Sequence, residues 1–138
     1  MKPLLLAFLL ALAEGPGPGK GIAWLRDEAR AVSAARESGR PLLIEFRAAW
    51  CGACKLLDLH TWSDPAVQRE VAERFVPLEL DLSGQGEPEE KIQLRYGVAE
   101  LPTVLLMQAD HIPPVEGAGR IPGFVPPAEL LRLLRAVK

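Results

Sequence analysis

The chain contains two cysteines, Cys51 and Cys54, in the pattern Cys-Gly-Ala-Cys. Two intervening residues bring the second thiol within reach of the first, so a mixed disulfide formed by Cys51 can be resolved by Cys54. The pair follows an apolar run typical of a buried strand and is expected to begin a helix, where free amides and the helix dipole favour a thiolate. The spacing therefore predicts dithiol–disulfide exchange, with Cys51 as the attacking sulfur.

A structural disulfide or half of a zinc site would have the same spacing. A zinc site needs two further ligands, but the chain has no other cysteine, and His60 and His111 stand at unrelated spacings. We therefore expect neither a metal nor an organic cofactor. Two rival functions stay open: a disulfide-forming oxidase, and a non-catalytic module that uses both cysteines as soft metal ligands.

Glu45 and Asp58 are candidate proton carriers near the cysteines. Glu45 lies in the apolar run before Cys51, where a buried carboxylate is costly unless it has a task. Asp58 follows Cys54 by about one helical turn, which places both side chains on the same helix face. The alternatives are that Glu45 reaches solvent and that Asp58 is a solvated helix residue. Arg47 either lines a substrate groove or ends its strand in solvent.

Alternating helices and strands are expected to position these residues. Periodicity, capping residues and Gly/Pro breaks predict helices over 22–38, 51–60, 65–75, 87–96 and 126–137. Leu25, Ala29 and Val32 share one face of the first of these helices, and Gly39 follows as its stop. Strands are predicted over 42–46, 76–82 and 103–107, with a short edge strand within 108–124. This order predicts an α/β protein with a sheet between two layers of helices.

Two separated motifs resemble the thioredoxin family. Trp50-Cys51-Gly52-Ala53-Cys54-Lys55 is similar to the thioredoxin active-site motif Trp-Cys-Gly-Pro-Cys-Lys, and residues 96–103, Tyr-Gly-Val-Ala-Glu-Leu-Pro-Thr, are similar to the second signature of that family. The resemblance is closer to the C-terminal thioredoxin-like domain of DsbD, a bacterial membrane disulfide reductase, through residues 49–55, 61–68 and 123–124. It covers residues 22–138 and implies a thioredoxin fold, whose central mixed β-sheet is flanked by helices on both faces.

The resemblance also implies a substrate-binding surface around the cysteines. Pro102 would be a cis-proline that faces the sulfurs, and Leu101 would present its backbone to an extended substrate. Trp50, Gly52 and Ala53 would complete this surface. By itself, the Leu-Pro-Thr sequence predicts only a turn before a strand. Ala53 stands where thioredoxin has proline, so the strength of thioredoxin as a reductant is not transferred.

For the acids, the resemblance implies that Glu45 accepts the proton of a buried Cys54 and that Asp58 is a second acid. It also implies protein disulfides or dithiols as partners, and a membrane thiol that donates electrons. The expected direction is reduction of the partner.

The composition is that of a single globular domain. A length of 138 residues with 49% hydrophobic residues is enough for a core without metals or several disulfides. The formal net charge is -2, and lysines and arginines do not cluster, so we expect no nucleic-acid partner.

The N-terminus predicts export. Lys2 precedes an apolar run that closes on Ala11-Leu12-Ala13, the pattern of a secretory signal peptide over residues 1–13. The run is shorter than the ~20 apolar residues that cross a bilayer. Residues 14–21 are expected to form a Gly/Pro linker, and residues 22–138 the thioredoxin-like domain. We therefore expect a periplasmic or otherwise exported protein.

Overall fold

A four-stranded mixed sheet forms the centre of the computed structural model, which describes residues 21–111 and 119–138. The strands are β1 (Leu42–Arg47), β2 (Val76–Asp81), β3 (Thr103–Met107) and β4 (Arg120–Pro122). They lie in the order β2-β1-β3-β4, with β1 parallel to β2 and antiparallel to β3, and with β3 antiparallel to β4. β1 is thus a central strand, and it leads directly to the cysteines.

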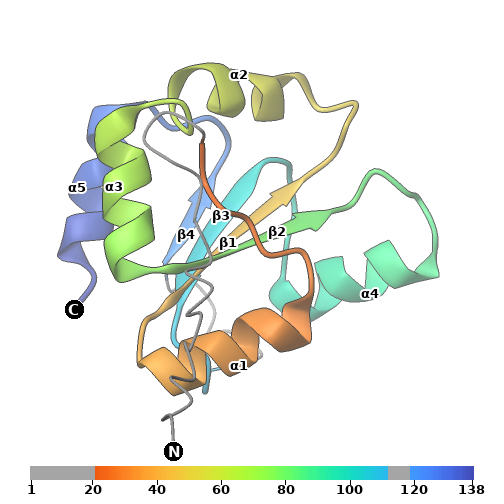
Figure 1. Cartoon of the computed structure of the whole chain (residues 1–138). Helices are drawn as coiled ribbons and strands as arrows, with labels where there is room; N and C mark the ends of the chain where they lie inside the picture. Colours follow the sequence, from red (N-terminus) through yellow and green to blue (C-terminus); the bar gives the residue numbers. More distant parts are fainter. Residues whose placement is uncertain (1–20, 112–118) are drawn as a thin grey trace, which may run out of the picture.

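Helices cover both faces of this sheet (Figure 1). They are α1 (Glu28–Ser38), α2 (Gly52–His60), α3 (Pro65–Arg74), α4 (Glu87–Tyr96) and α5 (Pro127–Ala136). Two hydrophobic clusters show the layers, because α1 and α4 contribute to one cluster whereas α2, α3 and α5 contribute to the other. The predicted α/β architecture, with a mixed sheet between helical layers, is confirmed.

Strand β1 joins the two clusters because alternate side chains point to opposite faces of a sheet. Ile44 and Phe46 pack with α1 and α4, whereas Leu43 packs with α3 and α5. Glu45 and Arg47 follow Leu43 at the same period, so these two charged side chains lie on the α3 and α5 face. The apolar strand therefore carries a polar pair at the end that adjoins the cysteines.

Capping residues set the start of α3 and the ends of α1 and α4 where the sequence predicts. Asp64 caps α3 by accepting the amides of Ala66 and Val67, and Pro65 occupies the first helical position. Gly39 and Gly97 adopt positive φ values of 70° and 64° after α1 and α4, a conformation that favours glycine. The short edge strand β4 is also found within the predicted range.

The prediction of a helix over 22–38 is wrong at its start. Asp27 caps the helix by accepting the amide of Arg30, and α1 begins only at Glu28. Leu25 instead lies in an extended segment that makes a parallel bridge to Leu78 of β2, with its amide and carbonyl bonded to that strand. Tertiary pairing with β2 thus replaces the first helical turns that the spacing favoured.

The proposed signal peptide at residues 1–13 lies outside the described residues, as does the linker up to residue 20. Within residues 21–111 and 119–138, no helix is both long and apolar enough to span a membrane.

Candidate functional site

Cys51 and Cys54 form a disulfide at the start of α2, with 5.3 Å between their Cα atoms. Cys51 is the N-cap of this helix, and the backbone amide of Cys54 donates to its sulfur at 3.2 Å. Cys51 is 6% exposed, whereas Cys54 is completely buried. The helix N-terminus therefore stabilises a thiolate on the outer sulfur, that of Cys51. Burial shields the inner sulfur, that of Cys54, from solvent.

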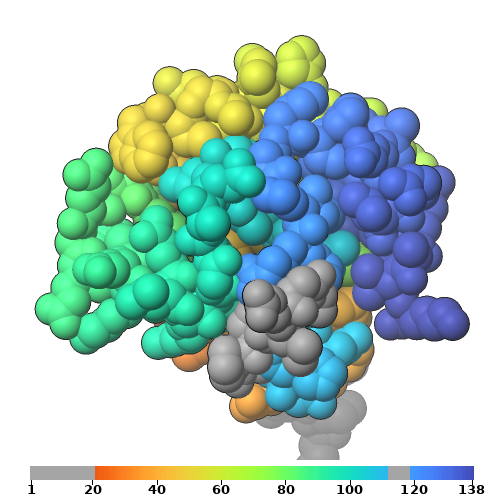
Figure 2. Space-filling view, turned by 180° about the vertical axis from the view of Figure 1, so that it is seen from behind, coloured from red at the N-terminus to blue at the C-terminus, as the bar shows by residue number. Residues whose placement is uncertain are grey.

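The residues expected to bind substrate surround this disulfide. Leu101 and Ala53 pack against the cluster that Ala48 forms with the two cysteines, and the Leu101–Pro102 peptide bond is cis. Gly52 is exposed beside Cys51. Figure 2 shows the face on which the start of α2 (yellow), the segment before β3 (blue-green) and the segment before α5 (blue) meet.

Trp50 is 61% exposed, but it is not free of the fold. Its indole nitrogen donates to the carbonyl of Ser83 at 3.3 Å, and the amide of Ala49 donates to the Ser83 hydroxyl at 2.7 Å. Ser83 in turn donates to Asp81 through both its amide and its hydroxyl. Ser83 and Asp81, which no sequence motif singled out, thus hold the loop before Cys51 against the end of β2.

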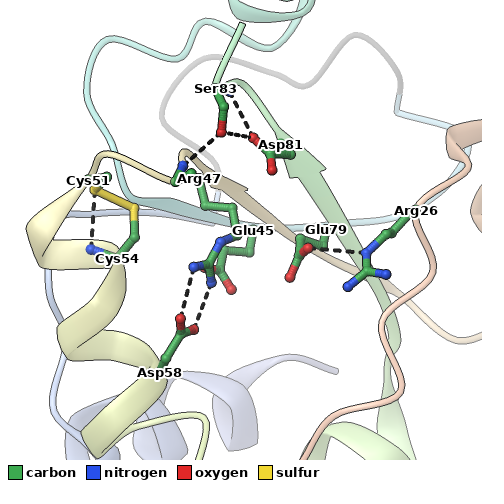
Figure 3. Close-up of polar contacts among 10 residues, drawn as sticks. Arg26, Glu45, Arg47, Cys51, Cys54, Asp58, Glu79, Asp81 and Ser83 are labelled. Carbon is green, nitrogen blue, oxygen red and sulfur yellow. Dashed lines mark hydrogen bonds and ion pairs between the residues drawn. A yellow bond between two sulfur atoms is a disulfide. The ribbon is translucent and has the colours of Figure 1, made fainter.

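The two predicted acids meet in one cluster with Arg47. Nη1 of Arg47 donates to Oε1 of Glu45 at 3.1 Å and to Oδ1 of Asp58 at 2.7 Å, while Nη2 donates to Oδ2 of Asp58 at 2.8 Å. Figure 3 shows Asp58 on α2 facing the guanidinium from β1. The Arg47 side chain does not end in solvent, because it is 16% exposed and binds both acids.

Glu45 does not reach solvent, since its side chain is fully buried. Burial raises its pKa from 4.5 to about 8, with Arg47 lowering the value and Asp58 and Glu79 raising it. A group with this pKa can exchange a proton with a thiol near neutral pH. Asp58 differs, because its side chain is 46% exposed at the surface end of the cluster.

A sequence signal for Arg47 does exist. It follows Glu45 by two residues in a strand, so both side chains lie on one face, and a buried carboxylate needs a partner.

Among residues 21–111 and 119–138, no three His, Cys, Asp or Glu side chains group as a metal site would require.

Comparisons with known proteins agree on the class of protein that this fold and disulfide define. A family model described as "Thioredoxin-like" matches residues 23–109. The solution structure of a thioredoxin from Thermus thermophilus has a TM-score of 0.68 and 28% identity, over 85% of this chain and 87% of that one. The oxidised C-terminal domain of DsbD from Neisseria meningitidis has a TM-score of 0.66 at 22% identity, over 84% and 100%.

Among curated proteins, "Thiol:disulfide interchange protein DsbD" of Yersinia pestis (strain Pestoides F) is 31% identical over 103 residues, which are 73% of this chain. The DsbD of Pectobacterium atrosepticum is 33% identical over 95 residues, or 67% of the chain. The matched stretch spans only 16% of either relative. The chain belongs to the thioredoxin-like family and is related to DsbD.

Proposed function

We propose that this protein reduces disulfides of other proteins outside the cytoplasm. The observation that supports this most is the disulfide at the N-terminus of α2, where Cys51 borders the surface and Cys54 is buried beneath it. These two features favour exchange chemistry, because a purely structural disulfide needs neither a helix N-terminus nor unequal exposure of its two sulfurs.

The reaction is two successive thiol–disulfide exchanges. The Cys51 thiolate attacks one sulfur of the partner's disulfide, forms a mixed disulfide and releases the other partner sulfur as a thiolate, which takes a proton. Cys54 then loses its proton and attacks the Cys51 sulfur, which breaks the mixed disulfide and releases the second partner thiol. The partner gains two electrons and two protons, and the protein is left with the Cys51–Cys54 disulfide.

Glu45 accepts the proton of Cys54 in the second exchange. A pKa of about 8 lies close to the ordinary value of a thiol, so the transfer has little free-energy cost in either direction. Arg47 holds Oε1 of Glu45, whereas Oε2 is buried with no hydrogen-bond partner and is available for the proton. Asp58 acts at the outer end of this cluster.

The partner binds as an extended segment beside the disulfide, along the backbone of Leu101 and Pro102. Three exposed apolar side chains support this, since Trp50, Leu56 and Phe124 are 61%, 45% and 41% exposed. The Phe124 and His60 rings lie at 82° to each other, with 6.3 Å between the ring centres. Such apolar side chains suit an unfolded or extended protein partner.

The protein receives its electrons from a membrane thiol and is exported by the signal peptide at residues 1–13. Relatedness to DsbD and the basic, then apolar, N-terminus support this placement. N-terminal sequencing of the protein from a periplasmic fraction tests it. A cytoplasmic protein that retains Met1 would contradict export.

Reduction of insulin driven by dithiothreitol tests the chemistry. Wild type is expected to accelerate precipitation of the insulin chains, and Cys51→Ser is expected to lose the acceleration. Cys54→Ser provides a matched test, because it should accumulate mixed disulfides through Cys51 that nothing resolves. A wild-type protein that binds a soft metal ion but does not reduce insulin would instead be a binding module.

A further inference from the structure

Arg47 binds both acids near the disulfide. Its side chain is 16% exposed and lies between Glu45, which is fully buried, and Asp58, which is 46% exposed. Both guanidinium nitrogens bind Asp58, but only Nη1 reaches Glu45, and it does so over a longer distance. The cation is therefore shared unequally, with the closer contacts going to the outer acid.

Other groups face Glu45 from the neighbouring elements. In the sheet, Glu79 of β2 lies beside it on one side and the apolar Val104 of β3 on the other. Arg26 from the extended segment before α1 pairs with Glu79 at 3.3 Å. Trp62 follows α2, and its buried indole nitrogen has no hydrogen-bond partner. This nitrogen lies close enough to Glu45 to lower the pKa of that carboxyl.

Charges also surround Arg47. Asp81 is its register partner on β2, but the amide and hydroxyl of Ser83 already bind that carboxylate. A cleft of about 650 Å³ opens beside the cluster and is lined by residues that include Arg47, Asp58 and Glu79. The outer end of the cluster is therefore open to solvent, whereas Glu45 does not line the cleft.

We propose that Arg47 is a positioning residue that shares its charge between Glu45 and Asp58, and that Asp58 thereby controls when Glu45 can accept the proton of Cys54. This rests on the proposed proton transfer. When Asp58 holds the guanidinium, Glu45 keeps only part of the cation and its carboxylate is less stable. When Asp58 is replaced by uncharged asparagine, the full cation becomes available to Glu45.

The balance of charge gives the sign of the effect. With Glu45 protonated, Arg47 and Asp58 form a neutral pair, whereas ionised Glu45 adds a second negative charge to one cation. Ionised Asp58 and Glu79 therefore oppose loss of the proton, and Arg47 favours it, which agrees with the directions in which these groups shift the pKa of Glu45. Removing Arg47 and removing the charge of Asp58 must act in opposite directions.

The test follows the second exchange with glutathione disulfide as the probe. Reduced protein forms a mixed disulfide with glutathione, and release of the second glutathione is timed by rapid quenching and mass spectrometry across pH. Asp58→Asn is expected to move the pH midpoint of this step down. Arg47→Met is expected to move it up and to slow release near neutral pH by about tenfold or more, a loss typical of an impaired general base.

Two controls separate this role from a structural one. Arg47→Lys keeps the cation, so its midpoint should lie closer to wild type than that of Arg47→Met. Titration of the Glu45 carboxyl by carbon-13 NMR in the oxidised protein, assigned with Glu45→Gln, should show the same shifts. A lower melting temperature with unmoved midpoints is the result of a structural role alone.

The variants distinguish the two proposals. If Glu45→Gln leaves the second exchange unchanged, the proposed proton acceptor is wrong. If Glu45→Gln slows it but Asp58→Asn leaves the Glu45 midpoint in place or raises it, the role of Arg47 and Asp58 is wrong and the proton acceptor stands. Asp58 is half exposed, so its variant is expected to fold even where Arg47→Met does not.

Discussion

Cys51 and Cys54 differ in surroundings although they share one disulfide. The sulfur of Cys51 caps α2 and accepts an amide, and Cys51 is slightly exposed, whereas Cys54 is fully buried. In the reduced protein Cys51 should therefore react with iodoacetamide much faster than Cys54. Mass mapping after a short labelling pulse measures this, and preferential labelling of Cys54 would reverse the assigned roles.

Glu45 makes the stability of the oxidised protein depend on pH. Its pKa in the folded protein, about 8, exceeds the value of 4.5 expected for the unfolded chain, so the folded state binds more protons between these values. The free energy of unfolding should therefore be greatest below the unfolded pKa and fall as pH rises through the folded pKa. The full shift corresponds to a loss of roughly 5 kcal/mol at most.

Glu45→Gln should abolish this loss, because glutamine does not ionise. Denaturant unfolding of the oxidised proteins at about pH 5 and about pH 9 measures it, and the variant should be the more stable of the two at the higher pH. Equal pH dependence in both proteins would mean that Glu45 is not the group that titrates.

At the residue scale, the pairing of Cys51 with Cys54 and the burial of Glu45 were predictable from the cysteine spacing and from the apolar run around Glu45. The Arg47 partnership was only partly predictable. Alternation along β1 puts Glu45 and Arg47 on one face, but the contact to Asp58 depends on how α2 crosses the end of the strand. No local pattern in the sequence encodes that crossing.

At the scale of helices and strands, boundaries set by neighbouring residues were predictable, whereas the boundary set by a distant contact was not. The end of α1 at Gly39 and the start of α3 at Asp64 were predicted because glycine and aspartate act on neighbouring amides and carbonyls. The start of α1 was mistaken because Leu25 pairs with Leu78 of β2, far along the chain. Helical spacing of apolar residues cannot exclude an extended segment that buries the same side chains by pairing with a sheet.

The end of α2 is tied to the segment before α5 by one buried hydrogen bond. The Thr61 hydroxyl donates to the carbonyl of Val125 at 2.6 Å, and Thr61 is fully buried. Thr61→Val keeps the shape but leaves this carbonyl without its donor, which should lower the free energy of unfolding by roughly 1–3 kcal/mol. Thr61→Ser retains the hydroxyl and should lose less, as denaturant unfolding would show. Equal losses in both variants would assign the effect to packing.

At the scale of the whole molecule, the order of elements was predictable and the fold class followed from it. Five helices and four strands appear in the described residues in the predicted order, because each strand is a short apolar or alternating run between clear breaks. The strand order β2-β1-β3-β4 could not be predicted from any single segment, because the connections between strands decide which of them pair and whether they are parallel or antiparallel. The resemblance to thioredoxin predicted a mixed sheet, and the structure adds the strand order.

The direction of electron flow is a property of the whole protein, because it depends on how much the fold favours the reduced pair over the disulfide. DsbA is strongly oxidising since its reduced form is stabilised, with a cysteine pKa of ~3.5. Here the helix N-terminus also favours a thiolate on Cys51, but Gly52 and Ala53 place no cation or side-chain donor between the sulfurs. Leu101 and Ala48 surround the pair with apolar groups, which raise a thiol pKa.

The reduction potential should therefore lie closer to the roughly -270 mV of thioredoxin than to the roughly -120 mV of DsbA. At neutral pH the acid cluster adds little negative charge near the disulfide, because Arg47 pairs closely with Asp58 and Glu45 is largely protonated. The cluster becomes more negative as pH rises through about 8, the pKa of Glu45. Loss of the Glu45 proton should then make the reduced form harder to ionise and the protein a stronger reductant. Equilibration with glutathione across pH measures the potential, with Glu45→Gln as the control that lacks the extra pH dependence. A wild-type potential near that of DsbA would make this protein an oxidase.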